Sequence, residues 1–193
     1  MANAAYGLEF SRTLHGGTPV TKRFYIPSTN STALFKNDVV ELVNTTGAMD
    51  PKGEVPQITQ FVTGHIPLGV VSNFGVDSSA VLTGNYRAAS TNRYVDVIVD
   101  PDACYYAMQD DVAGAMTQAS IGALTNCALI IGSGSTATGY SGTMVDSSQV
   151  TASAADVKVI GIKADSVNVG AATACELEVV LMGAAIRATD SQS

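Results

Sequence analysis

A serine between two glycines is the feature of this chain that comes closest to a catalytic motif. Ser141 stands in the sequence GYSGT at 139–143, and the nucleophile elbow of serine hydrolases also places its serine between glycines. That elbow needs a glycine two places after the serine, where this chain has Thr143. It also joins a strand to a helix, whereas Ser141 lies in a segment whose glycine and serine content predicts a loop. The motif therefore does not predict a nucleophile.

A metal site is the other chemistry to consider. The densest acidic group consists of Asp96, Asp100, Asp102, Asp110 and Asp111. Carboxylates around a turn bind calcium, but the EF-hand pattern of alternating ligands followed by a distant glutamate is absent. Charges that keep sheet edges from aggregating explain the group equally well. The two histidines, His15 and His65, stand in none of the spacings typical of zinc sites. We therefore predict no metal ion and no cofactor, with calcium as the alternative.

The cysteines indicate neither a disulfide framework nor a reactive thiol. Cys104, Cys127 and Cys175 are an odd number without CxxC spacing, and each lies in or beside an apolar run. A free thiol in such a run acts as a small hydrophobe. We expect all three to be buried and reduced. The sequence GSG at 132–134 lacks the third glycine and the following helix of a phosphate-binding turn, so we interpret it as a flexible loop.

The elements that must position these residues are β-strands. In RYVDVIVDPD at 93–102, valines occupy positions 95, 97 and 99, which suits a pleated, half-buried surface, and DPD supplies a turn. A second strand is expected to start at Ala103. The same pattern, bounded by turn-forming residues, predicts strands at 38–43, 68–74, 128–132, 157–162 and 177–182. No convincing helix interrupts them, so we predict an all-β protein.

Two segments between these strands are less regular. Residues 112–126 place apolar side chains at helical intervals, but Gly114 and Gly122 would each cost a helix about 1 kcal/mol. We interpret this segment as irregular or strand. Residues 132–143 contain four glycines among serine and threonine, which predicts a long surface loop.

Charge and composition together divide the chain into three parts. Residues 1–36 hold four of the ten lysines and arginines but one of the seventeen acidic residues. We interpret 1–36 as an extended N-terminal arm with one or two strands, 37–186 as the folded β-domain, and 187–193 as a polar tail. The basic side chains of the arm, which are compatible with contact to an acidic protein surface or with simple solvation, are Arg12, Lys22, Arg23 and Lys36.

Composition narrows the classes of partner. The net charge of −7, without a continuous basic stripe, argues against nucleic-acid binding. No apolar run approaches the roughly 20 residues that span a bilayer, so we expect no membrane association. Charged residues make up only 14% of the chain, below the roughly 25% of an ordinary domain. A surface so poor in charge indicates either coverage by neighbouring subunits or a compositional habit of the source.

The order of these segments resembles a family of head decoration, or cement, proteins of tailed bacteriophages. The stretches that carry the resemblance cover rather more than a third of the chain. They are DVVELV at 38–43, LGVVSNF at 68–74, RYVDVIVDPDACYYAMQDD at 93–111, GSTATGYSGTMVDSSQV at 134–150, VKVIGIKAD at 157–165 and ELEVVLM at 176–182.

The resemblance implies a compact β-barrel or β-tulip-like body and a homotrimer at local three-fold axes of the capsid. It also implies N-terminal arms that contact the major capsid protein on the outer surface of the virion, and no catalytic residues. We accordingly expect a non-enzymatic structural protein that stabilises a phage head by bridging capsomers. A protein associated with the tail or fibre, and a carbohydrate-binding or adhesin-like β-domain, are the alternatives. Deleting residues 1–36 is expected to weaken attachment while leaving the barrel folded.

Overall fold

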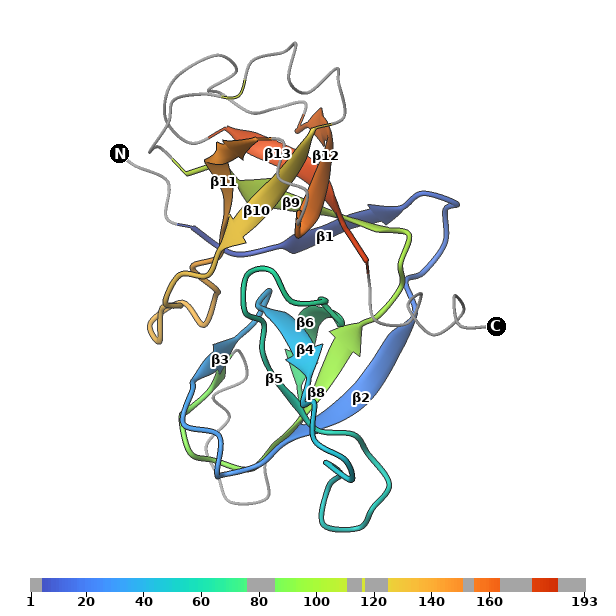
Figure 1. The fold of residues 1–193 in the computed structure, drawn as a ribbon, viewed down its shortest axis with the longest axis vertical. Coiled ribbons are helices and arrows are strands. Elements are labelled where there is room, and N and C mark those ends of the chain that lie inside the picture. The colour runs from blue at the N-terminus through green and yellow to red at the C-terminus, as the bar shows by residue number, and fades with distance from the viewer. Residues whose placement is uncertain are drawn as a thin grey trace.

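The prediction of an all-β protein is confirmed. The computed structural model describes residues 5–75, 86–110, 116, 125–150, 155–163 and 175–183, and the regular structure in this part consists of β-strands (Figure 1). No helix able to span a membrane is found among these residues. The segment 112–126, apart from 116, 125 and 126, lies outside the described residues. So do the polar tail 187–193 and the boundary before it.

Within the described residues, the strands form two large antiparallel sheets and one small one. The six-stranded sheet has the order β1 (Glu9–Thr13), β9 (Ala103–Met108), β13 (Glu176–Leu181), β12 (Val157–Ile162), β10 (Asn126–Ile130), β11 (Met144–Val150). The five-stranded sheet has the order β2 (Thr21–Ile26), β8 (Arg93–Ile98), β6 (Gly69–Phe74), β4 (Val39–Leu42), β5 (Ile58–Gln60). The small sheet pairs β3 (Leu34–Phe35) with β7 (Tyr86–Arg87). The strands expected from Arg93, from Ala103 and in the five other runs are all present, with ends shifted by up to two residues.

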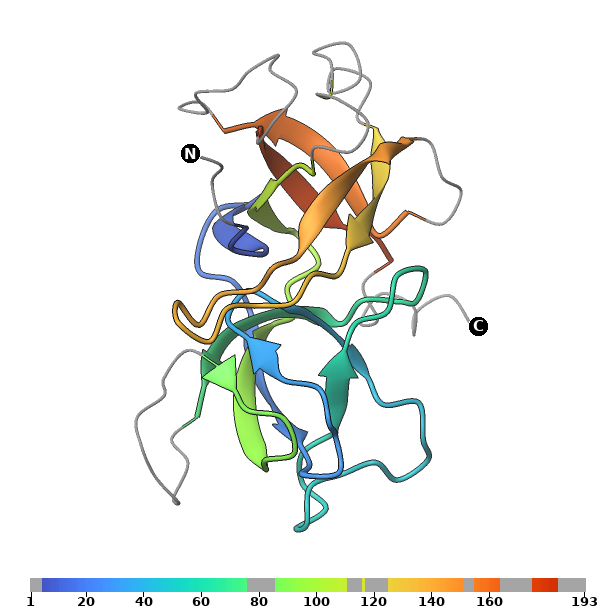
Figure 2. The same cartoon turned by 90° about the vertical axis from the view of Figure 1, so that its left-hand side faces the viewer.

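Both large sheets curl back on themselves, and they lie one above the other in Figures 1 and 2. In the six-stranded sheet, Gln109 after β9 forms an isolated parallel bridge to Val145 of β11. In the five-stranded sheet, Tyr25 of β2 forms one to Gln57 before β5. Each contact is a single bridge and not a ladder, so a continuous closed barrel is not shown, and the barrel or tulip-like body stays a prediction.

Alternating apolar residues produce two cores: one lies inside the five-stranded sheet, and the larger one combines the six-stranded sheet with Val39, Val70 and Ile98 of the five-stranded sheet. On β8, Val95 and Val97 are fully buried, as their period of two requires for a strand with one face on the core. They belong to the core of the five-stranded sheet. On β13, Leu177 and Val179 are likewise fully buried in the core of the six-stranded sheet. Leu8 joins that second core from the N-terminal segment.

The sequence predicted an extended N-terminal arm, but in the structure this segment forms part of the sheets. β1 pairs with β9, and all six residues of β2 pair with β8. Leu8, Ile26 and Leu34 have no exposed surface. Residues 9–35 thus contribute strands to all three sheets and side chains to both cores. Removing them would expose apolar surface, and would not detach an independent arm.

The loop at 131–143 is irregular, as expected, but parts of it are buried. It leaves β10, reaches the five-stranded sheet and returns to β11 (Figure 2). Gly134 lies so close to the ring of Phe35 that a Cβ at this position would overlap it. Ser141 and Thr143 have almost no exposed surface. The glycine-rich sequence therefore permits close packing between the sheets and not only flexibility.

Candidate interaction surface

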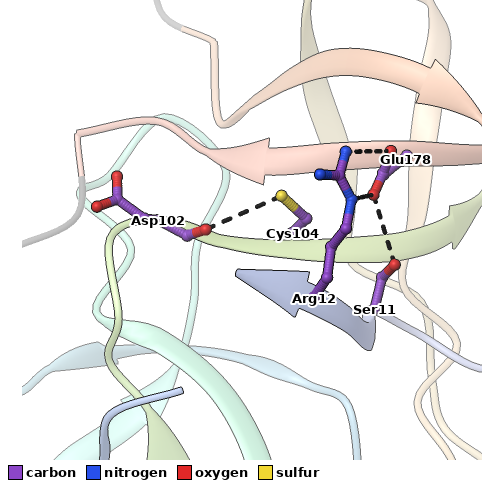
Figure 3. Close-up of polar contacts among 5 residues, drawn as sticks. All are labelled: Ser11, Arg12, Asp102, Cys104 and Glu178. Carbon is purple, nitrogen blue, oxygen red and sulfur yellow. Dashed lines mark hydrogen bonds and ion pairs between the residues drawn. The ribbon is translucent and has the colours of Figure 1, made fainter. Parts of the chain in front are cut away.

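Arg12, one of the four predicted contact residues, is tied to the protein's own surface. Its Nε lies 2.7 Å from Glu178 Oε1 and its Nη2 lies 3.1 Å from Glu178 Oε2 (Figure 3). Ser11 Oγ donates to the same carboxylate over 3.4 Å. Figure 3 also shows Cys104 between this pair and Asp102, whose carbonyl oxygen accepts from the thiol. The paired guanidinium links β1 to β13 across β9.

The other three predicted residues lie on two further parts of the chain. Arg23 on β2 faces its register partner Asp96 on β8, with Nε 3.0 Å from Oδ1. Lys22 is exposed on the neighbouring position of β2, so its side chain points to the opposite face. Lys36 lies between β3 and β4, with its Nζ 5.9 Å from the centre of the Tyr140 ring. The structure therefore does not gather the four into one basic patch.

Removing either arginine pair is expected to change stability little. In Arg12→Met and Arg23→Met, we expect the free energy of unfolding to fall by less than about 1 kcal/mol, because exposed ion pairs contribute only that much. Urea unfolding at low and high salt measures this change, with Glu178→Gln as the matched partner variant. A loss several times larger, insensitive to salt, would contradict the description of these pairs as exposed surface contacts.

A cavity of about 310 Å³ lies between the two large sheets. Its apolar lining consists of Leu8, Phe10, Val70, Val71 and Ile98. Its polar lining consists of Glu9, Lys36, Asn37, Ser72 and Tyr140. These residues come from β1, β6, β8, the β3–β4 connection and the 131–143 loop, which are far apart in sequence. No local sequence pattern could therefore have indicated the cavity, although Lys36 itself was among the predicted residues.

Asn37 fixes the wall of this cavity through backbone hydrogen bonds. Its carbonyl accepts from Leu8 N–H over 3.0 Å, and its own N–H donates to Val71 carbonyl oxygen over 2.9 Å. Its side-chain amide donates to the carbonyl of Tyr6. The backbone φ of Asn37 is +69°, a left-handed conformation that asparagine adopts more readily than most residues. One residue thus holds the N-terminal segment against β6.

Asp38, the next residue, is a buried carboxyl group. It has no exposed surface, and Phe35 N–H donates to its Oδ2 over 2.7 Å. Its Oδ1 has no hydrogen-bond partner among the described residues. Burial raises the pKa of Asp38 to about 7, while the nearby Ser141 side chain and the hydrogen bond from Phe35 N–H act in the opposite direction. The group is consequently protonated over a wider pH range than an ordinary aspartate.

Ser141, the residue of the near-motif, is closed to solvent. Its Oγ donates to Thr143 Oγ1 over 3.0 Å and accepts from Thr143 N–H over the same distance. The two histidines bind elsewhere, His15 to Asp102 and His65 to Glu41. The serine hydroxyl therefore serves a buried turn, and no histidine contact to it is found within the described residues.

The predicted acidic group is dispersed. Asp96 pairs with Arg23, Asp100 accepts from the N–H of Asp102, and Asp110 accepts from Ser147. Asp111 lies outside the described residues. In the part of the chain that the structure describes, no group of three or more histidine, cysteine, aspartate or glutamate residues could hold a metal ion.

The prediction for the cysteines is confirmed. Cys104, Cys127 and Cys175 are free and buried. Burial, the largest cause, raises the pKa of Cys104 and that of Cys127, the latter to about 11. Both thiols consequently stay protonated at neutral pH.

Among the described residues, exposed large apolar side chains lie on β4, where Leu42 is 42% exposed, and, with higher exposure, at two separate loops. Leu14 and Val20 lie in the connection from β1 to β2, and are 49% and 52% exposed. Val62 and Ile66 lie in the connection from β5 to β6, and both are 53% exposed. The second loop is held by a hydrogen bond from Gly64 N–H to Asp156 Oδ1 over 3.1 Å.

Comparison with known proteins adds no relative, because no family model, curated protein or solved structure matches the chain.

Proposed function

We propose that this chain is a non-enzymatic structural protein of a phage virion, which binds the outer surface of the head and stabilises the capsid by bridging capsomers. The observation that carries the proposal is the pair of exposed apolar loops, at Leu14 and Val20 and at Val62 and Ile66. The order of sequence segments, which resembles that of head decoration proteins, supports it. The major capsid protein is then the partner, and the assembled chain is a homotrimer.

The two loops favour contact with neighbouring subunits on physical grounds. Each half-exposed valine, leucine or isoleucine gains about 1 kcal/mol when a partner covers its remaining surface. Because few charged groups accompany them, little desolvation opposes the association. A contact of this kind that spans two capsomers must break before the capsomers separate. The added buried area thereby raises the resistance of the shell to internal pressure.

Binding to isolated heads tests the proposal. We expect the purified chain to sediment with empty heads that lack it and to reach hundreds of copies per particle, measured by quantitative mass spectrometry. Electron microscopy of the decorated heads should place the added density on the outer surface. Binding of only a few copies at the tail would support a tail-associated role instead, and no binding would refute the proposal.

The assembly state gives a second, independent readout. Native mass spectrometry is expected to show three copies of the 19.8 kDa chain. In a Val62→Ser, Ile66→Ser double variant, we expect weaker binding to heads with an unchanged thermal unfolding temperature, because both side chains are already half exposed. Thr136→Ala, a change at another exposed loop position, is the control. A wild-type chain that is monomeric at all concentrations would contradict the trimer.

A further inference from the structure

The first strand has a free edge. In the six-stranded sheet β1 is the terminal strand, and β9 is its single strand partner in the part of the chain that the structure describes. The two large sheets otherwise return to themselves through the bridges at Val145 and at Tyr25. Edge strands present unpaired N–H and C=O groups to which another extended chain can add. In Figures 1 and 3, β1 lies on the side of β9 that faces the five-stranded sheet.

The hydrogen bond of Leu8 shows which groups of β1 point away from β9. Leu8 N–H donates to Asn37 carbonyl oxygen and not to β9. The register between β1 and β9 is regular at Glu9 and Phe10 and shifts only between Phe10 and Arg12. Because alternate residues of a regular strand direct their backbone groups to the same side, we infer that the N–H and C=O of Phe10 also point away from β9. Glu9, between them, is aligned with Tyr106 of β9. Asn37 thus pairs with Leu8 at the start of this edge. The backbone groups of Phe10 are the next ones along the edge to which another extended chain could pair.

The cavity lies beside Phe10, whose backbone groups are the ones available for pairing with another strand. Leu8 and Phe10 line one side of it, and Val70 of β6 and Ile98 of β8 line the other. Its volume of about 310 Å³ is at the lower end of the range of ligand sites, which is about 300 to 1,000 Å³. That space suits one or two apolar side chains better than a larger organic ligand. An extended chain beside Phe10 would direct alternate side chains into it.

Lys36, a charged residue of the cavity lining, indicates which kind of segment would bind there. Lys36 is half-buried on the cavity wall, and its ammonium group lies against the ring of Tyr140. No carboxylate partner of Lys36 is found among the described residues. A half-buried cation of this kind favours an anionic side chain on whatever fills the cavity. Glu9, exposed on β1 itself, disfavours further acidic residues at its own end of the edge.

We propose that an extended segment of the shell protein adds as a strand to the free edge of β1, with an apolar side chain in the cavity and an adjacent carboxylate on Lys36. The identity of the partner rests on the proposed function. The recognition itself rests on the backbone of Phe10, the cavity and Lys36. The segment bridges the two sheets of this chain and fixes it to the capsid through main-chain hydrogen bonds.

Two synthetic peptides test the recognition without a virion. The probe is a blocked heptapeptide of alternating threonine and valine with one central aspartate, and the control peptide has lysine in place of the aspartate. We expect the aspartate peptide to bind the full chain at least tenfold more tightly, and to slow hydrogen exchange at the Phe10 amide. Lys36→Glu should reverse the preference, whereas Lys22→Glu, at an exposed lysine outside the cavity, should leave it unchanged.

The inference would be overturned by binding of neither peptide, by an equal effect of the two lysine variants, or by a preference that survives Lys36→Glu. Concentration-dependent protection of the Phe10 amide in the protein alone would assign the edge to a second copy of this chain, and would overturn it as well. A Lys36→Glu chain that is unfolded by circular dichroism is replaced by Ser72→Trp. That change places an indole ring on the cavity lining and is expected to abolish binding of both peptides.

Binding to heads separates this inference from the proposed function. We expect Lys36→Glu to weaken binding at least tenfold and Lys22→Glu less than twofold. If wild-type protein and Lys36→Glu bind heads equally well, the proposed function stands and the strand-addition site is wrong. If wild-type protein does not bind heads but the peptide preference is observed, the proposed function is wrong and the site stands with another extended partner.

Discussion

Replacing Arg87 by methionine is expected to lower the free energy of unfolding by about 4 kcal/mol, the scale found when one partner of a buried charged network is removed. Arg87 has no exposed surface. Its Nε donates to Thr91 carbonyl oxygen over 2.7 Å, and its Nη1 to that of Thr32 over 2.6 Å. Its Nη2 donates to the carbonyls of Pro27 and Asn30 over 2.8 and 2.9 Å. One guanidinium thus satisfies four backbone acceptors of two separate loops.

The size of this effect follows from what methionine leaves behind. Methionine fills a similar volume, but the carbonyls of Thr32 and Thr91 lose the donor that Arg87 supplies. The carbonyls of Pro27 and Asn30 keep only one backbone N–H each, from Asn30 and from Ser90. Each unsatisfied buried group costs about 1 to 3 kcal/mol. Burial lowers the pKa of Arg87 to about 10, so the side chain is still charged at neutral pH. The planar arrangement of its donors also distinguishes it from lysine, which offers three donors from one point.

Urea unfolding at pH 7 measures the change. Arg87→Lys should keep the charge but recover only part of the stability, because one ammonium group cannot reach four carbonyls in two directions. Arg23→Met, at an exposed arginine, is the matched control and should stay within about 1 kcal/mol of wild type. An Arg87→Met protein as stable as that control would show that water or other groups satisfy the four carbonyls.

Replacing Asp38 by asparagine is expected to remove much of the dependence of stability on pH between about 4 and 7. The pKa of Asp38 rises from 3.8 in an exposed aspartate to about 7 in the folded protein. The folded state therefore binds more protons than the unfolded state within this window. The stability that Asp38 contributes is fully present below about pH 3.8 and is lost as the pH rises through 7, by about 4 kcal/mol in total.

Asparagine keeps an acceptor for Phe35 N–H but carries no charge at any pH. At pH 8 the Asp38→Asn protein is consequently expected to be more stable than wild type, and at pH 4 the two should agree within about 1 kcal/mol. Thermal unfolding across this range, with the wild type measured in parallel, isolates the contribution of Asp38 from those of other carboxyl groups. Asp96→Asn, at a surface ion pair, is the control. Parallel profiles for wild type and Asp38→Asn would contradict the assignment.

The sequence predicted those strands whose own residues alternate between apolar and polar. The alternating valines of β8 and the alternation in β13 required only neighbouring positions. β1 was missed as part of the sheet because EFSRT has no apolar alternation, and its partner Tyr106 is nearly a hundred residues away. Long-range pairing of this kind leaves no local trace in the sequence. The segment therefore resembles an arm until its pairing with β9 is known.

The candidate site was less predictable than the fold. Lys36 was identified as a contact residue from charge alone, and charge does not distinguish it from Arg12 or Arg23. Those two are paired with carboxylates, Arg12 with Glu178 on β13 and Arg23 with Asp96 on β8. Lys36 is set apart by the cavity beside it, which exists only once β1, β6 and the 131–143 loop have come together. The burial of Arg87 likewise depends on loops that converge in space.

The three cysteines make the molecule convenient for chemical labelling. All are at most 1% exposed, and burial disfavours the thiolate that reacts with maleimides at Cys104 and Cys127. A cysteine introduced at an exposed position such as Thr136 would hence be modified much faster than the native ones. A dye or a gold cluster attached there would mark each copy at one defined point without first replacing any natural cysteine.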